Sequence, residues 1–213
     1  MSETILYGNP GWGSAIVEAQ LDVYGLPYRY EAVGDLFESA AARERLRPLN
    51  PVAQVPTLVL SGGPVMTESA AITLHLADLS GRDDLVPGPQ AAERAAFLRW
   101  LVFLVANVYP TFTYADEPSR FVKAADAQPG FREEVNAYAQ RLWQAVEAAA
   151  GAPWFLGARF SALDLFLAVM TRWRPGRDWF AAHAPRLHGA AEAARALPAL
   201  APMMARNFPP PKT

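Results

Sequence analysis

The sequence contains no cysteine and only three histidines among its 213 residues. Without cysteine, the chain can form no disulfide, no thiolate metal site and no thiol nucleophile, and it cannot itself carry out thiol–disulfide exchange. The three histidines, His75, His183 and His188, are scattered along the chain. A metal site needs several converging ligands, so we expect these histidines to be surface or packing residues and the protein to hold no metal.

The sequence also lacks a charge excess and a long apolar run. Its 19 basic and 21 acidic residues give a net charge of −2, which provides no electrostatic basis for binding nucleic acid or an anionic membrane. The N-terminal stretch MSETILYGNPGWG has no basic segment followed by a long apolar one, so it does not resemble a secretory signal. The longest apolar stretch, WLVFLVANVYP from Trp100, is expected to be too short to span a bilayer. We therefore expect a cytoplasmic protein.

The remaining composition is typical of a soluble globular chain, with 52% hydrophobic and 19% charged residues. A length of 213 residues fits one large domain or two small ones. The pattern changes near the turn-rich segment GRDDLVPGP. We therefore expect a first domain at residues 1–80, a linker at 81–89 and a second domain at 90–213.

The first eighty residues alternate strand and helix patterns. Strands are predicted at 4–8, 27–33, 57–60 and 64–67, the last two joined by a Gly62–Gly63 hairpin turn. Helices are predicted at 14–24 and 68–80, with a short helix or turn near 39–47. Ser14 can cap the first helix, and Glu18 lies in its early turns, where an acid complements the dipole. This order predicts a mixed four-stranded sheet covered by helices, an α/β thioredoxin-like domain.

From Gln90 onward the sequence contains no convincing strand pattern. Apolar residues recur at helical spacing in AAERAAFLRWLVFLVANVYPTF and FREEVNAYAQRLWQAVEAAAG, and Ala-rich segments continue to Arg206. In SALDLFLAVMTRW, Ser161 precedes Asp164 by three residues, as in a capping box. We assign this pair to folding and expect the second domain to be all-helical.

Two short features between the predicted strands indicate a binding site. Pro56 stands at the entrance of a strand, and a cis Val55–Pro56 bond would leave the backbone groups of Val55 pointing outward, where an extended peptide can pair with them. The Glu68–Ser69 pair stands at the start of the next helix. There, backbone N–H groups and the Ser69 hydroxyl can hold a carboxylate, while Glu68 can meet an ammonium group. Alternatively, Pro56 is a trans proline on an edge strand, and Ser69 is only a helix cap; we expect Ser69 to be both a cap and a ligand-binding residue.

The segment NPVAQVPTLVLSGGPVMTESAAITLHLAD resembles the glutathione-binding part of cytosolic glutathione S-transferases, and FLGARFSALDLFLA resembles the capping box of that family. The resemblance extends over nearly the whole chain and is closest to bacterial, cysteine-free members. It implies that Val55 and cis Pro56 hold the cysteinyl backbone of glutathione, that Glu68 and Ser69 hold its γ-glutamyl end, and that Gln54 reaches its glycyl end. It also implies a homodimer.

The group that would activate the thiol is left open by the sequence. In the resembled family, the donor is a Tyr at the end of the first strand or a Ser in the loop that follows, whereas this loop reads YGNPGWGSA with a Trp between its glycines. Ser14, Tyr7, and Asn9 or a backbone N–H of the loop are the alternatives, and a fourth is that no residue fills this role. Trp12 would line the site or simply pack against the helical domain.

Aromatic residues in the helix after the linker are candidates for the second substrate. The resemblance implies a small hydrophobic electrophile, and Pro110 is expected to end or kink the helix and turn its last aromatics toward the site. The implied function is glutathione transfer in detoxification. A non-catalytic glutathione-binding or assembly module and a glutathione-dependent isomerase or peroxidase remain alternatives. The candidate residues are Trp100, Phe103, Asn107, Tyr109, Phe112 and Tyr114.

Overall fold

The structure is a computed structural model, and it describes residues 3–210. The chain divides into two compact units, one comprising residues 1–86 and 194–213 and the other residues 87–193. The division near Val86 falls inside the turn-rich segment that the sequence indicates as a linker. The C-terminal residues belong to the first unit, which the helical pattern alone did not indicate.

The first unit contains the predicted mixed four-stranded sheet, which confirms the expected fold class. The strands are β1 (Ile5–Gly8), β2 (Arg29–Ala32), β3 (Thr57–Val59) and β4 (Val65–Met66), in the order β2-β1-β3-β4. β1 is parallel to β2 and antiparallel to β3, and β3 pairs antiparallel with β4 through the predicted hairpin. Leu6 and Leu58, which are paired in register, are both fully buried, so this face of the sheet forms the core of the unit.

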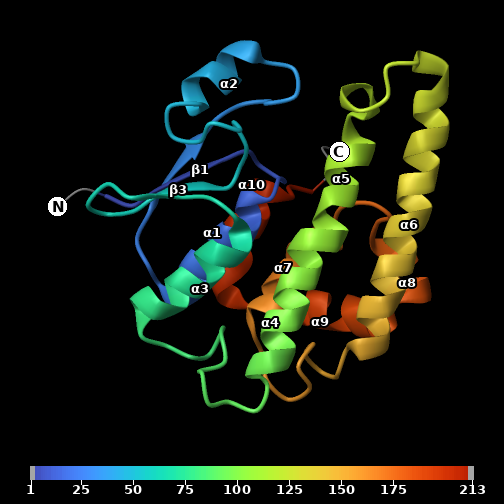
Figure 1. Cartoon of the computed structure of the whole chain (residues 1–213). Helices are drawn as coiled ribbons and strands as arrows, with labels where there is room; N and C mark the ends of the chain where they lie inside the picture. Colours follow the sequence, from blue (N-terminus) through green and yellow to red (C-terminus); the bar gives the residue numbers. More distant parts are fainter. Residues whose placement is uncertain (1–2, 211–213) are drawn as a thin grey trace. The chain divides into compact units, whose positions relative to one another are not determined.

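Helices cover both faces of this sheet. Helix α2 (Ala40–Leu46) lies on one side, and α1 (Ser14–Tyr24) and α3 (Ser69–Ser80) lie on the other (Figure 1). The short helix α2 begins at a capping serine, because Ser39 Oγ accepts the N–H of Ala42 at 3.1 Å. The segment η4 (Pro198–Leu200) and helix α10 (Ala201–Asn207) pack against α1. The C-terminal end of the chain therefore completes the layer of helices on the α1 side.

The second unit contains only helices apart from two isolated bridges between residues 154 and 159. The core includes the fully buried Trp143 and Phe180, whose rings meet edge to face at 5.0 Å. Its elements are α4 (Arg94–Phe103), η1 (Leu104–Val108), α5 (Tyr109–Asp116), η2 (Pro118–Arg120), η3 (Ala125–Ala127), α6 (Gln128–Ala149), α7 (Ala162–Met170), α8 (Arg177–His183) and α9 (Pro185–Arg195).

The capping box at the start of α7 is formed as predicted. Ser161 and Asp164 exchange the two side-chain-to-backbone bonds of the motif, and Asp164 Oδ1 also accepts the N–H of Phe155 at 2.8 Å. Both residues are fully buried. Burial raises the pKa of Asp164 to about 6, although its hydrogen bonds to Phe155 and Ser161 oppose this shift.

The sequence predicts that Pro110 ends or kinks its helix, and the first of these does not occur. The chain stays helical from Arg94 to Asp116, and the π-helical segment η1 stands immediately before the proline. The Tyr109 N–H bonds to the carbonyl of Leu104, five residues earlier. This wider turn accommodates the proline, which lacks a donor, without breaking the helix.

The helical segment Arg94–Asp116 is long and apolar enough to cross a membrane, by length and composition alone. This differs from the expectation that the apolar stretch from Trp100 is too short to do so. In the structure, 39% of the most apolar window of this segment is buried inside the protein.

Candidate functional site

Three chain segments meet at one end of the sheet in the first unit. β1 ends at Gly8, and the loop that follows it leads into α1. In the adjacent strand, Thr57 lies opposite Tyr7, so the turn before β3 is at the same end. Leu58 lies opposite Met66, the last residue of β4, so the start of α3 is there as well. The antiparallel pairing of β3 with its two neighbours therefore brings together the loop after β1, the turn at Val55 and the residues Glu68 and Ser69.

The turn before β3 presents an unpaired backbone edge. The Val55–Pro56 peptide bond is cis, as predicted, and Pro56 is buried. Within residues 3–210, neither the N–H nor the carbonyl of Val55 has a hydrogen-bond partner. The neighbouring carbonyl of Gln54 is held internally, because it accepts from Asn50 Nδ2 at 2.9 Å and from Thr57 Oγ1 at 2.8 Å. Val55 thus has one free donor and one free acceptor, and the hydrogen bonds to the Gln54 carbonyl hold the turn in place.

The start of α3 combines free N–H groups with an unusual backbone conformation. Glu68 is the residue before the helix and has φ 65° and ψ 102°, a region that residues other than glycine rarely adopt. Its exposed carboxylate accepts from the hydroxyl of Thr67 at 3.3 Å. Ser69 is the first helical residue and is 8% exposed. Among the described residues, the N–H groups of Ser69, Ala70 and Ala71 have no acceptor, so they are available to an anion.

Ser69 does not cap the helix. The capping position belongs to Glu68, and no side chain caps the helix start. The expectation that Ser69 has a double role, as cap and as ligand, is therefore wrong for the cap. Its hydroxyl lies one residue too late in the chain to accept the N–H groups of the first turn in the usual way.

The loop after β1 is tightly closed around Ser14. The N–H of Trp12 bonds to the carbonyl of Asn9 at 3.0 Å, and Gly13 is the residue before α1. Ser14 is fully buried, and its hydroxyl accepts the N–H of Asn9 at 3.2 Å and donates to the Asn9 carbonyl at 3.3 Å. A Cβ at Gly8 would lie 2.4 Å from Ser14 Oγ, so only glycine leaves room for this hydroxyl. Ser14 neither caps α1 nor faces the solvent side of the loop.

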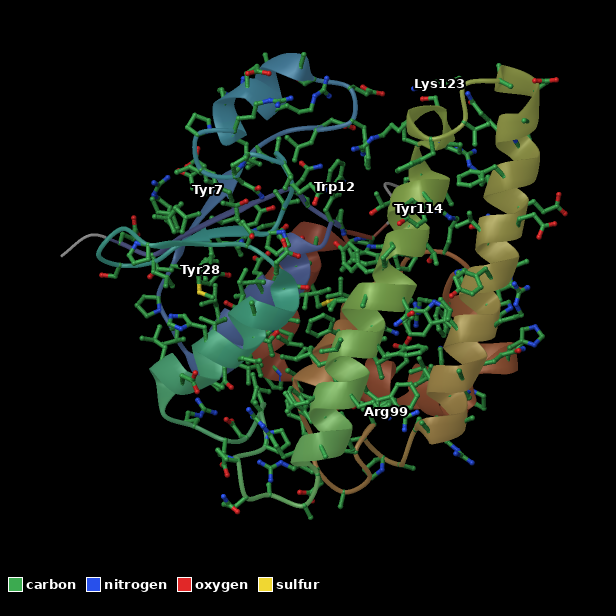
Figure 2. The ribbon with its side chains drawn as sticks, in the orientation of Figure 1. Tyr7, Trp12, Tyr28, Arg99, Tyr114 and Lys123 are labelled. Atoms are coloured by element: carbon green, nitrogen blue, oxygen red, sulfur yellow. The ribbon has the colours of Figure 1, made fainter. Side chains whose placement is uncertain are left out.

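Tyr7, Trp12 and Val55 contact one hydrophobic cluster on the α2 side of the sheet. Trp12 and its neighbour Phe37 have ring centroids 4.9 Å apart. Trp12 therefore packs against the segment that leads into α2, and it keeps part of its surface exposed beside the loop (Figure 2). The cluster ties the ends of all three segments to one support. Its buried members are Val33, Leu36, Ala42 and Leu46.

Glu18 does not have the role that the sequence predicts, that of an acid complementing the dipole of α1. Glu18 is fully buried and lies beyond the first turn of α1, so it does not serve as a helix-dipole acid. It pairs with Arg206, and Glu18 Oε2 accepts from Asn207 Nδ2 at 2.8 Å. Burial raises the pKa of Glu18, and its bonds to these two residues counteract this shift. The partners are 188 and 189 residues away in sequence, so the only local signal was an acid inside a largely apolar helix.

The aromatic candidates for a second substrate divide into two groups in the second unit. Trp100 and Phe112 are 8% and 7% exposed and belong to the core, where Trp100 meets Phe155 and Phe112 meets Trp173 edge to face. By contrast, Phe103, Asn107 and Tyr109 are half-buried, and Tyr114, which is labelled in Figure 2, is exposed at 42%. Only the second group presents substantial side-chain surface to a ligand.

Residues 16–79 match the model of the glutathione S-transferase N-terminal domain. Over 203 residues, the chain is 41% identical to the uncharacterized GST-like protein YncG of Escherichia coli (strain K12), covering 95% of this chain and 97% of that protein. The matched segment of the family model contains every candidate that follows Ser14 in the first unit.

Two solved structures are similar over nearly the whole chain. A glutathione transferase homolog from Sulfitobacter, solved with bound glutathione, superposes with a TM-score of 0.81 at 22% identity and covers 95% of this chain and 97% of its own. A sphingomonad glutathione S-transferase in complex with glutathione has a TM-score of 0.76 at 26% identity, with 94% and 96% coverage. The first likeness, at this identity, shows the shared fold alone.

Proposed function

Because this chain belongs to the glutathione S-transferase family, we propose that it binds glutathione at the sheet end formed by the loop after β1, Val55 and the start of α3. One observation carries this proposal: unpartnered backbone groups of Val55 and of the first turn of α3 converge at the same end of the sheet. Glutathione is an extended tripeptide with a free amino-acid end, and these groups match its backbone and its carboxylate. Two similar structures are described as containing bound glutathione.

Each part of the tripeptide has a counterpart in the site. The N–H and carbonyl of Val55, next to Pro56, pair with the cysteinyl backbone as a short added strand. The Ser69 hydroxyl and the free N–H groups of α3 bind the γ-glutamyl carboxylate, which the positive end of the helix dipole also favours. The Glu68 carboxylate meets the γ-glutamyl ammonium. Gln54, whose side chain is exposed, reaches the glycyl end.

The thiol of bound glutathione would lie beside the loop after β1. A free thiol has a pKa of about 8.5, and lowering it by two units takes about 2.7 kcal/mol of preferential thiolate stabilisation. We assign this stabilisation to the Asn9 side-chain amide and to the start of α1. In the described part of the chain, that amide and the N–H groups of Gly13 and Ser14 have no partner. The Ser14 hydroxyl is occupied in holding the loop.

Tyr7 and Trp12 support the site from the α2 side, and we place Tyr7 after Asn9 as a donor to the thiolate. Both rings pack on the cluster next to Val55. In this position Trp12 shields the sulfur from water, and Tyr7 holds the end of β1 in register with Thr57. Tyr7 is the second candidate for the thiolate donor, since its hydroxyl has no hydrogen-bond partner within the described residues.

The reaction that follows is transfer of the thiolate to a small hydrophobic electrophile. The sulfur forms a bond to the electrophilic carbon. In a substitution, the leaving group departs with its bonding electrons; in an addition to a double bond, the other carbon receives the electron pair of that bond and then takes up a proton. From the family resemblance alone, Phe103, Asn107 and Tyr114 stay candidates for contact with the electrophile. Following the family, we also propose a cytoplasmic homodimer that acts in detoxification.

A second candidate, a glutathione-binding module without catalysis, is favoured by the burial of the only hydroxyl in the loop region after Gly8, that of Ser14. One experiment decides between the two. Glutathione is titrated into the protein by calorimetry, and the ultraviolet absorbance of the bound thiolate is followed across pH. Binding with a thiol pKa well below 8.5 supports the transferase, and conjugation of a chlorinated nitrobenzene then confirms it. Binding with an unshifted pKa supports the module, and no binding contradicts both.

A further inference from the structure

The C-terminal helix α10 reaches the loop after β1 through one side chain. Asn207 is the last residue of α10 and is 5% exposed. Its Oδ1 accepts the N–H of Gly11 at 3.0 Å. Gly11 is in the middle of the loop, three residues before α1 begins. A side chain near the C-terminus of the chain thus holds the backbone of the loop that we assign to the glutathione thiol.

The orientation of the Asn207 amide is fixed by two acceptors on its other side. The amide Nδ2 donates to Glu18 Oε2 at 2.8 Å and to the carbonyl of Met203 at 2.8 Å. Both are acceptors, so the nitrogen must face them and the oxygen must face Gly11. Flipping the amide would place a donor against the Gly11 N–H and break all three bonds.

Glu18 is itself held in place by further contacts. It pairs with Arg206, and it accepts from the Tyr28 hydroxyl at 3.3 Å. The guanidinium of Arg206 also lies 5.0 Å from the centre of the Tyr30 ring. Glu18 is fully buried, so its position is fixed by these partners and by packing in α1. The bonds therefore form a continuous path from the core of α1 through Asn207 to the loop.

The loop and α10 also approach each other by their backbones. Gly11 has φ 79°, and a Cβ at this position would lie 3.2 Å from the Asn207 carbonyl oxygen. A glycine is needed here both for the conformation and for the approach. On its other side the loop is closed by the bonds between Asn9 and Ser14. Gly11 is consequently held by α10 while Asn9 is held by α1.

We infer that Asn207 is a positioning residue for the thiol site: it fixes the loop from Asn9 to Gly13 through the Gly11 N–H, and Glu18 fixes Asn207. This inference rests on the proposed function for its effect on glutathione, whereas the contact to the loop can be tested without glutathione. The last helix of the chain is then a structural part of the glutathione site. In the wild-type protein, the loop amides and the Asn9 side chain are preset for the sulfur.

The first test is amide hydrogen exchange of the full chain in the absence of glutathione, followed by nuclear magnetic resonance. We expect Asn207→Ala to accelerate exchange of the Gly11 amide about tenfold, because the bond that protects it is lost. Met204→Ala is the control for general loosening of α10 and should leave Gly11 protected. Unchanged exchange at Gly11 in Asn207→Ala would overturn the inference.

The second test separates the two ends of the Asn207 amide. Asn207→Asp keeps an acceptor for the Gly11 N–H but places a second carboxylate against Glu18. In the double variant Glu18→Gln/Asn207→Asp, the amide at position 18 can donate to the carboxylate at position 207, so the hydrogen bond between the two positions is restored. We expect Asn207→Ala and Asn207→Asp to raise the thiol pKa of bound glutathione by about one unit, and the double variant to return it to within about 0.3 units of the wild type. A structural role alone would lower stability without moving this pKa.

The outcomes distinguish this inference from the proposed function. Failure of the wild-type protein to bind glutathione contradicts the proposed function, and the exchange at Gly11 then decides the contact alone. Tight binding by the wild type with an unchanged thiol pKa in Asn207→Ala contradicts the inference and leaves the proposed function standing. Should Asn207→Ala fail to fold, Asn207→Asp and the double variant supply the comparison, and absence of recovery in the double variant counts against the inference.

Discussion

Asn9 and Ser14 hold each other in both directions, since the Asn9 N–H donates to Ser14 Oγ and the Ser14 hydroxyl donates back to the Asn9 carbonyl. One hydroxyl thereby bonds to both backbone groups of the residue that begins the loop, and the Asn9 carbonyl accepts the Trp12 N–H as well. Because Ser14 is fully buried, this contact defines its role as support for the loop. The side-chain amide of Asn9 has no partner among the described residues, so it is available to a ligand.

We expect Ser14→Ala to lower the free energy of unfolding by about 1–2 kcal/mol, because it leaves the Asn9 N–H without its partner, whereas the Asn9 carbonyl keeps its bond to the Trp12 N–H. The thiol pKa of bound glutathione should change less than it does in Asn9→Ala. Chemical denaturation and ultraviolet titration of the thiolate measure the two effects. A large rise of the thiol pKa in Ser14→Ala with unchanged stability would make Ser14 the thiolate donor after all.

Asn9→Ala should raise the thiol pKa of bound glutathione by about one unit, the loss expected for one hydrogen bond to a charged group. Its stability should stay within about 0.5 kcal/mol of the wild type, since the amide has no partner in the described structure. Tyr7→Phe is the matched comparison. If Tyr7→Phe raises the thiol pKa and Asn9→Ala does not, the donor is Tyr7.

Ser69→Ala should weaken glutathione binding about tenfold or more, because a hydroxyl bond to a carboxylate is lost. Stability should change little, since Ser69 is not the cap of α3. Calorimetry gives the affinity and thermal unfolding gives the stability. The matched control is Ser80→Ala at the other end of the same helix, where the hydroxyl bonds to the Ala77 carbonyl at 3.0 Å. Equal loss of affinity in both variants would rule out a specific role for Ser69.

Glu68 combines a rare backbone conformation with a proposed contact to the ligand ammonium, so stability and binding should change in opposite directions. Glu68→Gly removes the strain of a positive φ in the folded protein, although glycine also gives the unfolded chain more freedom. The net result should be a rise of up to about 1 kcal/mol in the free energy of unfolding. Binding of glutathione should weaken. Glu68→Gln removes the charge without relieving the backbone, so it should weaken binding alone. Unchanged affinity in both variants would exclude the ammonium contact.

Asp164 should make stability depend on pH in a defined direction. Its pKa in the folded protein is about 6, against about 3.9 in an unfolded chain, so the folded state binds the proton more tightly. The contribution of this group to stability is therefore fully present below pH ~4, falls by about 3 kcal/mol as pH rises to ~6, and is constant above that. Asp164→Asn should remove this change when unfolding is measured at several pH values, and a difference between the two proteins that is independent of pH would contradict the assignment.

The sequence alone determined the features that depend on near neighbours in the chain. The strand and helix order of the first eighty residues, the Gly62–Gly63 hairpin and the Ser161–Asp164 capping box were predicted and are present. The cis bond before Pro56 was also predicted. Such features follow from turn chemistry, hydrophobic spacing and the reach of a side chain over a few residues, which can be read from the order of the amino acids.

Only the tertiary structure decided which side chains face the site. Ser14 is buried although it directly follows a glycine-rich loop, and Pro110 follows a π turn and does not end its helix. The bonds from Asn207 to Glu18 and Gly11 join residues 189 and 196 positions apart. Long-range contacts of this kind depend on how complete elements pack, and a local pattern contains no information about the distant partner. The sequence therefore specified the pieces of this protein, and their packing specified the loop on which its proposed chemistry depends.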